Sequence, residues 1–220
     1  MDELLDEARA LIVTFKGAHY LFGDGALDRL GERIADLGRR AVLIAGGSGP
    51  SQQVAATVRA GLSRAGVEVV GELIGARPNA PRADVERLSA DLSGLDDDVL
   101  VVIGGGSGID AAKAAEVIRS LGGTVDDYFG TGRVSDALTR QAGRLRPLVA
   151  VQMAASSAAH LTKYSNVTDL ATAQKKLIVD EAIVPPLACF QYDVTCSMPP
   201  SMTADGAMDG LSHCLEVLYG

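Results

Sequence analysis

The chain has 220 residues, of which 47% are hydrophobic and 22% charged, an ordinary globular composition that excludes the disordered and fibrous classes. The chain has 20 Lys and Arg residues and 28 Asp and Glu residues, which gives a net charge of -8. This charge argues against a nucleic-acid-binding surface, because such a surface needs clustered cations. The longest apolar runs, at 41–45 and 99–103, are too short to cross a membrane, and the acidic opening lacks the order of a signal peptide. Three cysteines without CxxC spacing favour a reduced, cytoplasmic protein.

Short apolar runs alternate with longer amphipathic stretches along the chain. In chain order, the pattern predicts a helix over 26–37, a strand over 42–45, a helix over 51–65, a strand over 67–74, a helix over 82–92, a strand over 99–103 and a helix over 109–121. The order continues with an aperiodic surface connection over 123–146, a strand over 148–151, a hairpin over 161–180, a strand over 187–190 and a helix over 203–218. This alternation predicts an α/β fold, a Rossmann-like parallel sheet with helices on both faces. Two prolines within 198–201 mark the boundary between an α/β domain over 1–197 and a helical segment over 198–220.

A glycine-rich turn follows the most apolar strand directly. Gly104, Gly105, Gly106 and Ser107 stand between this strand and the next helix. Missing Cβ atoms let backbone amides approach a phosphate closely, and the first helical turn adds unpaired N–H groups and a positive dipole end. The strict dinucleotide fingerprint and the P-loop pattern both fail here. The turn therefore predicts either a phosphate-binding loop or a tight connection without a ligand.

The strand at 42–45 ends in a second glycine turn. Gly46 and Gly47 are followed by Ser48 and Ser51, with no acid at the position where an NAD enzyme usually carries one against the ribose hydroxyl. Without that carboxylate nothing repels a 2′-phosphate, and the hydroxyls can bond to one. The pattern favours NADPH weakly, and a turn without a ligand is the alternative.

One polar pair has the spacing of metal ligands. Asp209 and His213 are four residues apart on the predicted last helix, so both side chains project from one face. A carboxylate oxygen and an imidazole nitrogen can hold a divalent metal from one side, although a solvated polar stripe has the same pattern. A catalytic metal normally takes three or more protein ligands. The other candidate ligands lack diagnostic spacing: His19, His160, Asp193 and the three cysteines.

Three motifs in the right order resemble the iron-containing (group III) alcohol dehydrogenases, a superfamily that includes glycerol dehydrogenases and dehydroquinate synthase-like enzymes. GGGSGIDAAK at 104–113 is similar to the GGGSxxDxAK turn of that family, and RPNAP at 77–81 is similar to its PNP segment. MPPSMTADGAMDGLSHCLE at 198–216 resembles its lPxxlxxxxGxDALtHaiE helix. The resemblance runs over nearly the whole chain.

The resemblance implies a nucleotide-binding domain followed by an all-helical metal domain, of which 198–220 is the first helix, with the active site in the cleft between them. A divalent metal, Fe²⁺ or Zn²⁺, polarises an alcohol or carbonyl oxygen while hydride passes to or from NAD(P). Gly104, Gly105, Gly106 and Ser107 would contact the pyrophosphate, Gly46 and Ser48 the ribose end, and Asp209 and His213 the metal. Asp110 and Lys113 would lie near the nicotinamide or substrate, and Lys175 falls where the family often carries a Lys near the cleft. Asp110 with Lys113 can equally be a surface pair, and Lys175 a solvated side chain.

The resemblance also exposes departures from the family pattern. The family segment TTAGTGSE reads MAASSAAH at 153–160, so that Ser156 and Ser157 replace some of the hydroxyl donors and His160 stands in place of an acid. Gln191 occupies another position that is commonly acidic. Two further metal histidines of the family come from helices downstream of the last predicted helix. We therefore expect a fragment, a partner polypeptide or an incomplete metal site.

Three functions follow as expectations. The first is a metal-dependent NAD(P)-linked oxidoreductase that interconverts an alcohol and an aldehyde or ketone, with NADP(H) favoured and a homo-oligomeric state. The second is a non-redox, dehydroquinate synthase-like enzyme that acts on a phosphorylated sugar, which the few available cations disfavour: Lys113, Lys163, Lys175 and Lys176. The third is a catalytically incomplete nucleotide-binding or assembly module, because the apolar face of the last helix needs a partner.

Overall fold

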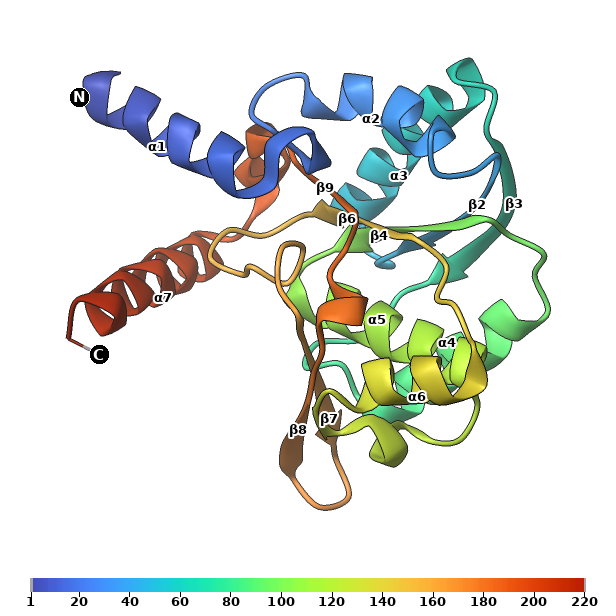
Figure 1. Cartoon of the computed structure of the whole chain (residues 1–220). Helices are drawn as coiled ribbons and strands as arrows, with labels where there is room; N and C mark the ends of the chain where they lie inside the picture. The colour runs from blue at the N-terminus through green and yellow to red at the C-terminus, as the bar shows by residue number, and fades with distance from the viewer. Residues whose placement is uncertain (1, 220) are drawn as a thin grey trace.

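The computed structural model describes residues 2–219, and its centre is a six-stranded parallel sheet (Figure 1). The strand order is β1-β9-β6-β4-β2-β3. The strands are β1 (Tyr20–Phe22), β2 (Arg40–Ala45), β3 (Glu68–Ile74), β4 (Val99–Gly104), β6 (Leu148–Gln152) and β9 (Leu187–Phe190). The predicted α/β fold, a parallel sheet with helices on both faces, is confirmed.

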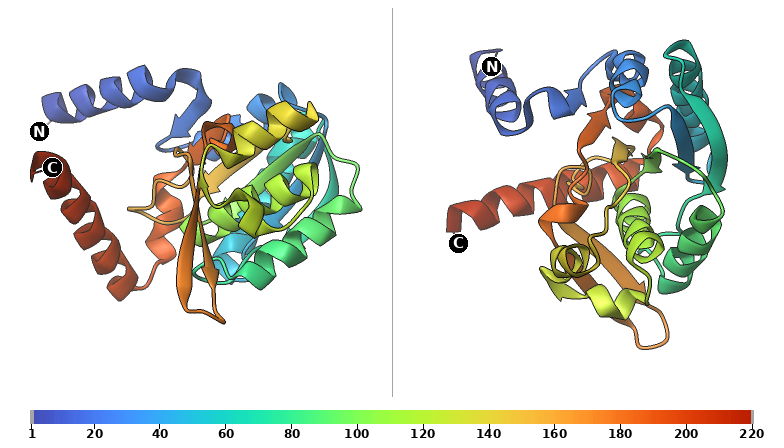
Figure 2. Two further views of the ribbon diagram at one scale, coloured as in Figure 1. Left: turned by 60° about the horizontal axis from the view of Figure 1, so that its bottom comes forward. Right: turned by 45° about the vertical axis from the view of Figure 1, so that its right-hand side comes forward.

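The central strands are continuous apolar runs because both of their faces are buried. On β4, Leu100 and Val102 face one core while Val99, Val101 and Ile103 face the other, and all five are at most 1% exposed. Helices α2 (Ala26–Ala35) and α3 (Gly49–Arg64) cover one face, and α4 (Arg82–Ser93), α5 (Gly106–Leu121) and α6 (Arg133–Gln141) lie over the other (Figures 1 and 2).

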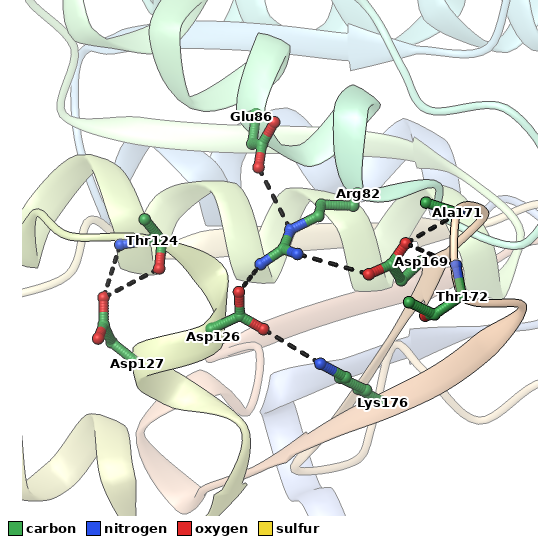
Figure 3. A network of polar contacts seen from close by, with 9 residues as sticks. All are labelled: Arg82, Glu86, Thr124, Asp126, Asp127, Asp169, Ala171, Thr172 and Lys176. Atoms are coloured by element: carbon green, nitrogen blue, oxygen red, sulfur yellow. Dashed lines mark hydrogen bonds and ion pairs between the residues drawn. The ribbon is translucent and has the colours of Figure 1, made fainter.

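A small second sheet lies beside α5. Its strands are β5 (Gly130–Thr131), β7 (Tyr164–Asp169) and β8 (Gln174–Val179), with β7 and β8 forming the predicted hairpin. Arg82 of α4 forms an ion pair with Asp169 at the end of β7, and it also pairs with Glu86 of its own helix and with Asp126 (Figure 3). Lys176 of β8 pairs with the same Asp126. These contacts fix the hairpin against α4 and against the turn that contains Asp126.

The prediction that 123–146 is an aperiodic surface connection is wrong. This segment contains a 3₁₀ turn at Val125–Tyr128, strand β5 and helix α6, and α6 buries Val134 and Ala137. The helix is nine residues long and offers few apolar positions, so its period is hard to see in the sequence. Strand β1 was also missed, because three residues are too few for a pattern.

The first and last helices project from the body (Figures 1 and 2). Helix α1 (Asp2–Lys16) exposes Leu4, Leu11 and Phe15 by 66–69%, and α7 (Pro200–Tyr219) has no buried residue. The apolar face of α7 therefore does not pack on the α/β domain. None of the helices in the described part of the chain has the length and apolar character that crossing a bilayer requires.

Candidate functional site

Two glycine turns lie side by side where the strand connections change direction. From β2 the chain continues outward to β3, whereas from β4 it continues in the opposite direction to β6, and β2 and β4 are neighbours. A crevice outside the carboxyl ends of the strands at such a switch point is where open α/β sheets bind ligands. Gly46 follows β2 and Gly104 ends β4, so both predicted turns are at this point.

The turn after β4 is tight because it consists of glycines. Gly105 is the N-cap of α5 and offers no side-chain cap, and a Cβ on Gly104 would lie 3.6 Å from the Cα of Gly108. No side chain caps the first amides of α5, and the positive end of the helix dipole at this point attracts an anion. The turn fits the pyrophosphate of a dinucleotide, and the roles of Gly104, Gly105 and Gly106 stay predictions.

Ser107 connects this turn to the 77–81 segment. Its hydroxyl oxygen accepts a hydrogen bond from the backbone N–H of Asn79 at 2.9 Å. Asn79 and Ala80 both have positive φ, and Arg77 is held by the carboxylate of Asp84 through its backbone N–H and guanidinium. The segment is thus fixed beside the glycine turn.

The turn after β2 ends in the cap of α3. Ser48 is the N-cap, and its hydroxyl accepts from the backbone N–H of Ser51 at 3.4 Å and donates to the hydroxyl of Ser51 at 3.1 Å. Gln52 donates its side-chain amide to the carbonyl of Gly46 at 2.8 Å. The structure therefore gives Ser48 a capping role, and a ribose contact from it stays a prediction.

The segment 153–160 packs along the whole glycine turn. The backbone N–H of Met153 donates to the carbonyl of Gly104 at 3.0 Å. A Cβ on Gly106 would lie only 2.6 Å from the hydroxyl of Ser157, so the missing side chain of Gly106 makes room for this neighbour. Ser156 is exposed and has φ of 68°, a conformation that favours glycine. Both predicted serines thus lie at this edge.

Asp110 and Lys113 point into the body rather than into open solvent. Asp110 is 6% exposed and accepts two hydrogen bonds from Asn166, and burial raises its pKa although these bonds act in the other direction. Lys113 is 2% exposed, and its ammonium donates to the carbonyls of Ala159, Thr162 and Tyr164 at 2.7, 2.7 and 2.9 Å. Burial lowers the pKa of Lys113 to about 8. These contacts are those of groups that hold backbone segments, and a catalytic role for either residue stays a prediction.

Lys175 lies exposed on β8, opposite Thr168 of β7. Its positive charge acts weakly on the pKa of Asp110, which places the two groups within electrostatic reach. The structure gives Lys175 no hydrogen-bonded partner among the described residues. A catalytic role for it stays a prediction.

Asp209 and His213 face the same side of α7. The carboxylate of Asp209 lies 3.7 Å from the Nε2 atom of His213, whose Nδ1 atom lies 3.2 Å from the carboxylate of Glu216. The side chains of the first two are 55% and 64% exposed, so both are accessible. One carboxylate and one imidazole fit one side of a divalent metal, but the described residues contain no group of three or more His, Cys, Asp or Glu side chains that could hold one. The metal role of this pair stays a prediction.

His160 is buried, and among the described residues it belongs to no group of three or more side chains that could hold a metal. It is 5% exposed, and its ring packs on Tyr20 and Phe190. Tyr20 was not singled out from the sequence, because a residue 140 positions away gives no local signal.

The two cavities of about 350 and 430 Å³ around Leu145 and Pro147 lie at the amino ends of β4 and β6, opposite the edge that carries the glycine turns.

A parallel sheet with glycine-rich turns at its switch point is the architecture of Rossmann-like dinucleotide-binding domains. The family model "Iron-containing alcohol dehydrogenase" matches residues 17–192, and the chain belongs to this family. The resemblance seen in the sequence is thereby confirmed.

Individual relatives agree with this assignment. The chain is 29% identical over 201 residues to the NAD-dependent methanol dehydrogenase of Bacillus methanolicus, covering 89% of this chain and 50% of that protein. It is 30% identical over 198 residues to the NADPH-dependent butanol dehydrogenase of Clostridium saccharobutylicum, covering 89% and 48%. A solved structure of 1,3-propanediol oxidoreductase superimposes with a TM-score of 0.80 at 26% identity, covering 90% of this chain and 50% of that one. The chain therefore spans about half the length of the curated relatives it matches.

Proposed function

We propose that this chain forms the dinucleotide-binding part of a metal-dependent NAD(P)-linked oxidoreductase that interconverts an alcohol and an aldehyde or ketone. The observation that carries the proposal is the pair of glycine turns at the switch point between β2 and β4. When bound, the dinucleotide supplies hydride chemistry, and a divalent metal, Fe²⁺ or Zn²⁺, polarises the substrate oxygen.

In this proposal, the chain's own residues bind and orient. The first amides of α5 hold the pyrophosphate, with Gly104 and Gly105 keeping the approach open. The segment 153–160 covers the glycine turn on its β6 side. Asp209 and His213 contribute two metal ligands from one face of α7.

We further propose that NADP(H) is favoured over NAD(H). Residues 46–51 carry no carboxylate that would bond the ribose hydroxyl or repel a 2′-phosphate. Helix α3 begins at the same point, so its positive end attracts an added phosphate. The relatives are of both kinds, since one is named for NAD and another for NADPH.

A thermal-shift titration tests both proposals. A ligand that binds only the native state stabilises it by mass action, so NADPH should raise the melting temperature more than NADH at equal concentration. Ser48→Asp should reverse this order, because it places a carboxylate where the 2′-phosphate would bind. Ser63→Asp, at the exposed far end of the same helix, is the matched control and should keep the wild-type order. Equal shifts would refute the NADP preference, and the lack of any shift would refute dinucleotide binding.

The non-redox alternative gains nothing from the structure. It requires several free cations for a phosphorylated sugar, yet Lys113 is bound to three carbonyls, Lys163 pairs with Glu181, and Lys176 pairs with Asp126. Of the four lysines, Lys175 alone has no such partner among the described residues, and one cation is too few for this role.

We also propose a homo-oligomer in a reducing, cytoplasmic setting. The exposed apolar residues of α7 support the first part, and the three free cysteines support the second. Cys189 is inert in this picture, because burial raises the pKa of its thiol to about 12.

A further inference from the structure

The 153–160 segment is held at both ends and exposed in the middle. At its first end, the sheet fixes Met153 through the hydrogen bond from its N–H to the Gly104 carbonyl at 3.0 Å. Ser156, in the middle, is exposed and adopts a left-handed conformation that costs an L residue roughly 1 kcal/mol or more. Such a conformation persists only where the surrounding structure enforces it, so the anchoring of the second end decides where Ser156 lies.

The second end is anchored by two buried side chains from distant elements. Lys113 of α5 donates to the carbonyl of Ala159, directly before His160, and to that of Thr162 shortly after it. The Nε2 atom of His160 lies 3.2 Å from the hydroxyl of Tyr20, and the two rings pack with centroids 5.3 Å apart. The segment is thus held to the neighbouring helix by the ammonium and to edge strand β1 by the imidazole.

His160 works in this anchor as a neutral ring. It is 5% exposed, and burial lowers its pKa to about 4, with the Lys113 charge acting in the same direction. Burial also raises the pKa of the Tyr20 hydroxyl, which keeps its proton. One hydrogen bond therefore joins two uncharged groups, and neither group needs a counter-ion in the interior.

The sheet order indicates which end of a dinucleotide this segment would meet. With the pyrophosphate at the amino end of α5, behind β4, the two halves of the molecule extend over the neighbouring strands, β2 on one side and β6 on the other. The turn after β2 is the proposed ribose-phosphate end. The nicotinamide half then reaches β6, whose following segment is 153–160.

We propose that Tyr20 and His160 are positioning residues that hold the 153–160 segment beside the glycine turn, with Ser157 against Gly106, and thereby set the affinity for the nicotinamide half of the dinucleotide. This inference rests on the proposed dinucleotide-binding function. It assigns a role to His160, which departs from the family pattern, and to its hydrogen-bond partner Tyr20 on strand β1.

Calorimetric titration of the whole chain with NADP⁺ and with 2′-phospho-ADP-ribose, which lacks nicotinamide, tests the proposal. Tyr20→Phe and His160→Asn each remove the hydrogen bond, and each should weaken NADP⁺ binding by about fivefold, the effect of one net hydrogen bond, while leaving 2′-phospho-ADP-ribose within about twofold. His160→Gln, whose longer amide can still reach Tyr20, should restore NADP⁺ binding. The double variant Tyr20→Phe/His160→Asn should bind no more weakly than His160→Asn alone, because both changes remove one interaction.

Tyr164→Phe is the matched control, since the Tyr164 side chain is 42% exposed on β7, and it should leave both dissociation constants unchanged. Equal weakening of both ligands in Tyr20→Phe and His160→Asn would show a general structural loss and overturn the proposal. Unchanged NADP⁺ binding in those variants, or additive losses in the double variant, would overturn it as well. If the wild-type chain binds neither ligand, the proposed function itself fails, which is a different result from selective failure at the nicotinamide half.

Discussion

Acidification should weaken this fold through His160. The pKa of its imidazole falls from the ordinary 6.5 to about 4 in the folded chain, because the ring is buried and lies near the Lys113 charge. Between these values the unfolded chain binds a proton that the folded chain does not, so stability is complete above pH 6.5 and is lost as pH falls toward 4. With 1.36 kcal/mol per pKa unit, the loss at pH 5 is about 2 kcal/mol and the full loss about 3 kcal/mol.

Urea unfolding followed by circular dichroism at pH 7 and pH 5 measures this contribution. Asp110 and Glu116, whose pKa values burial raises, titrate in the opposite sense, so wild type must be compared with His160→Gln, in which their effects cancel. The stability advantage of wild type over the variant should shrink by about 2 kcal/mol from pH 7 to pH 5. A constant difference between wild type and His160→Gln would refute the reasoning.

Two further predictions concern packing. Gly31→Ala should lower the free energy of unfolding by about 2–3 kcal/mol, because its Cβ would overlap the Gly61 carbonyl oxygen where α2 crosses α3. Gly94→Ala, with open space around its Cβ, should change this free energy little in the same urea assay. Leu215→Asp should reduce the apparent mass of the chain in analytical ultracentrifugation, because it places a charge in the exposed apolar face of α7, and an unchanged mass would show that this face is not an interface.

The sheet could be predicted from the sequence because its strands are buried on both faces. Such strands read as unbroken apolar runs, as at 99–103, and each is followed by an amphipathic helix. Two of the elements that were missed lack this contrast, whereas helix α1 was missed although its apolar residues have helical spacing. Strand β1 is short, and α6 buries only Val134 and Ala137, so neither leaves a clear period.

The site divides in the same way between local and non-local features. The glycine turns could be located because a strand, a turn and a helix are consecutive in sequence. The environment of Lys113 could not, because its three acceptors lie 46 to 51 residues away on a segment that carries no charge pattern pointing to it. A lysine one turn after an aspartate looks like a surface pair, and only the fold shows that the ammonium is buried.

Helix α5 connects the two halves of the proposed dinucleotide site. Its first residues form the glycine turn, while its second and third turns hold β7 through Asp110 and the end of the 153–160 segment through Lys113. Because a helix is a rigid element, a pyrophosphate bound at its amino end would lie at a fixed position relative to Ser156 and Ser157. The hydrogen bond between His160 and Tyr20 then supplies the one constraint that α5 cannot provide, the link from that segment to the far edge of the sheet.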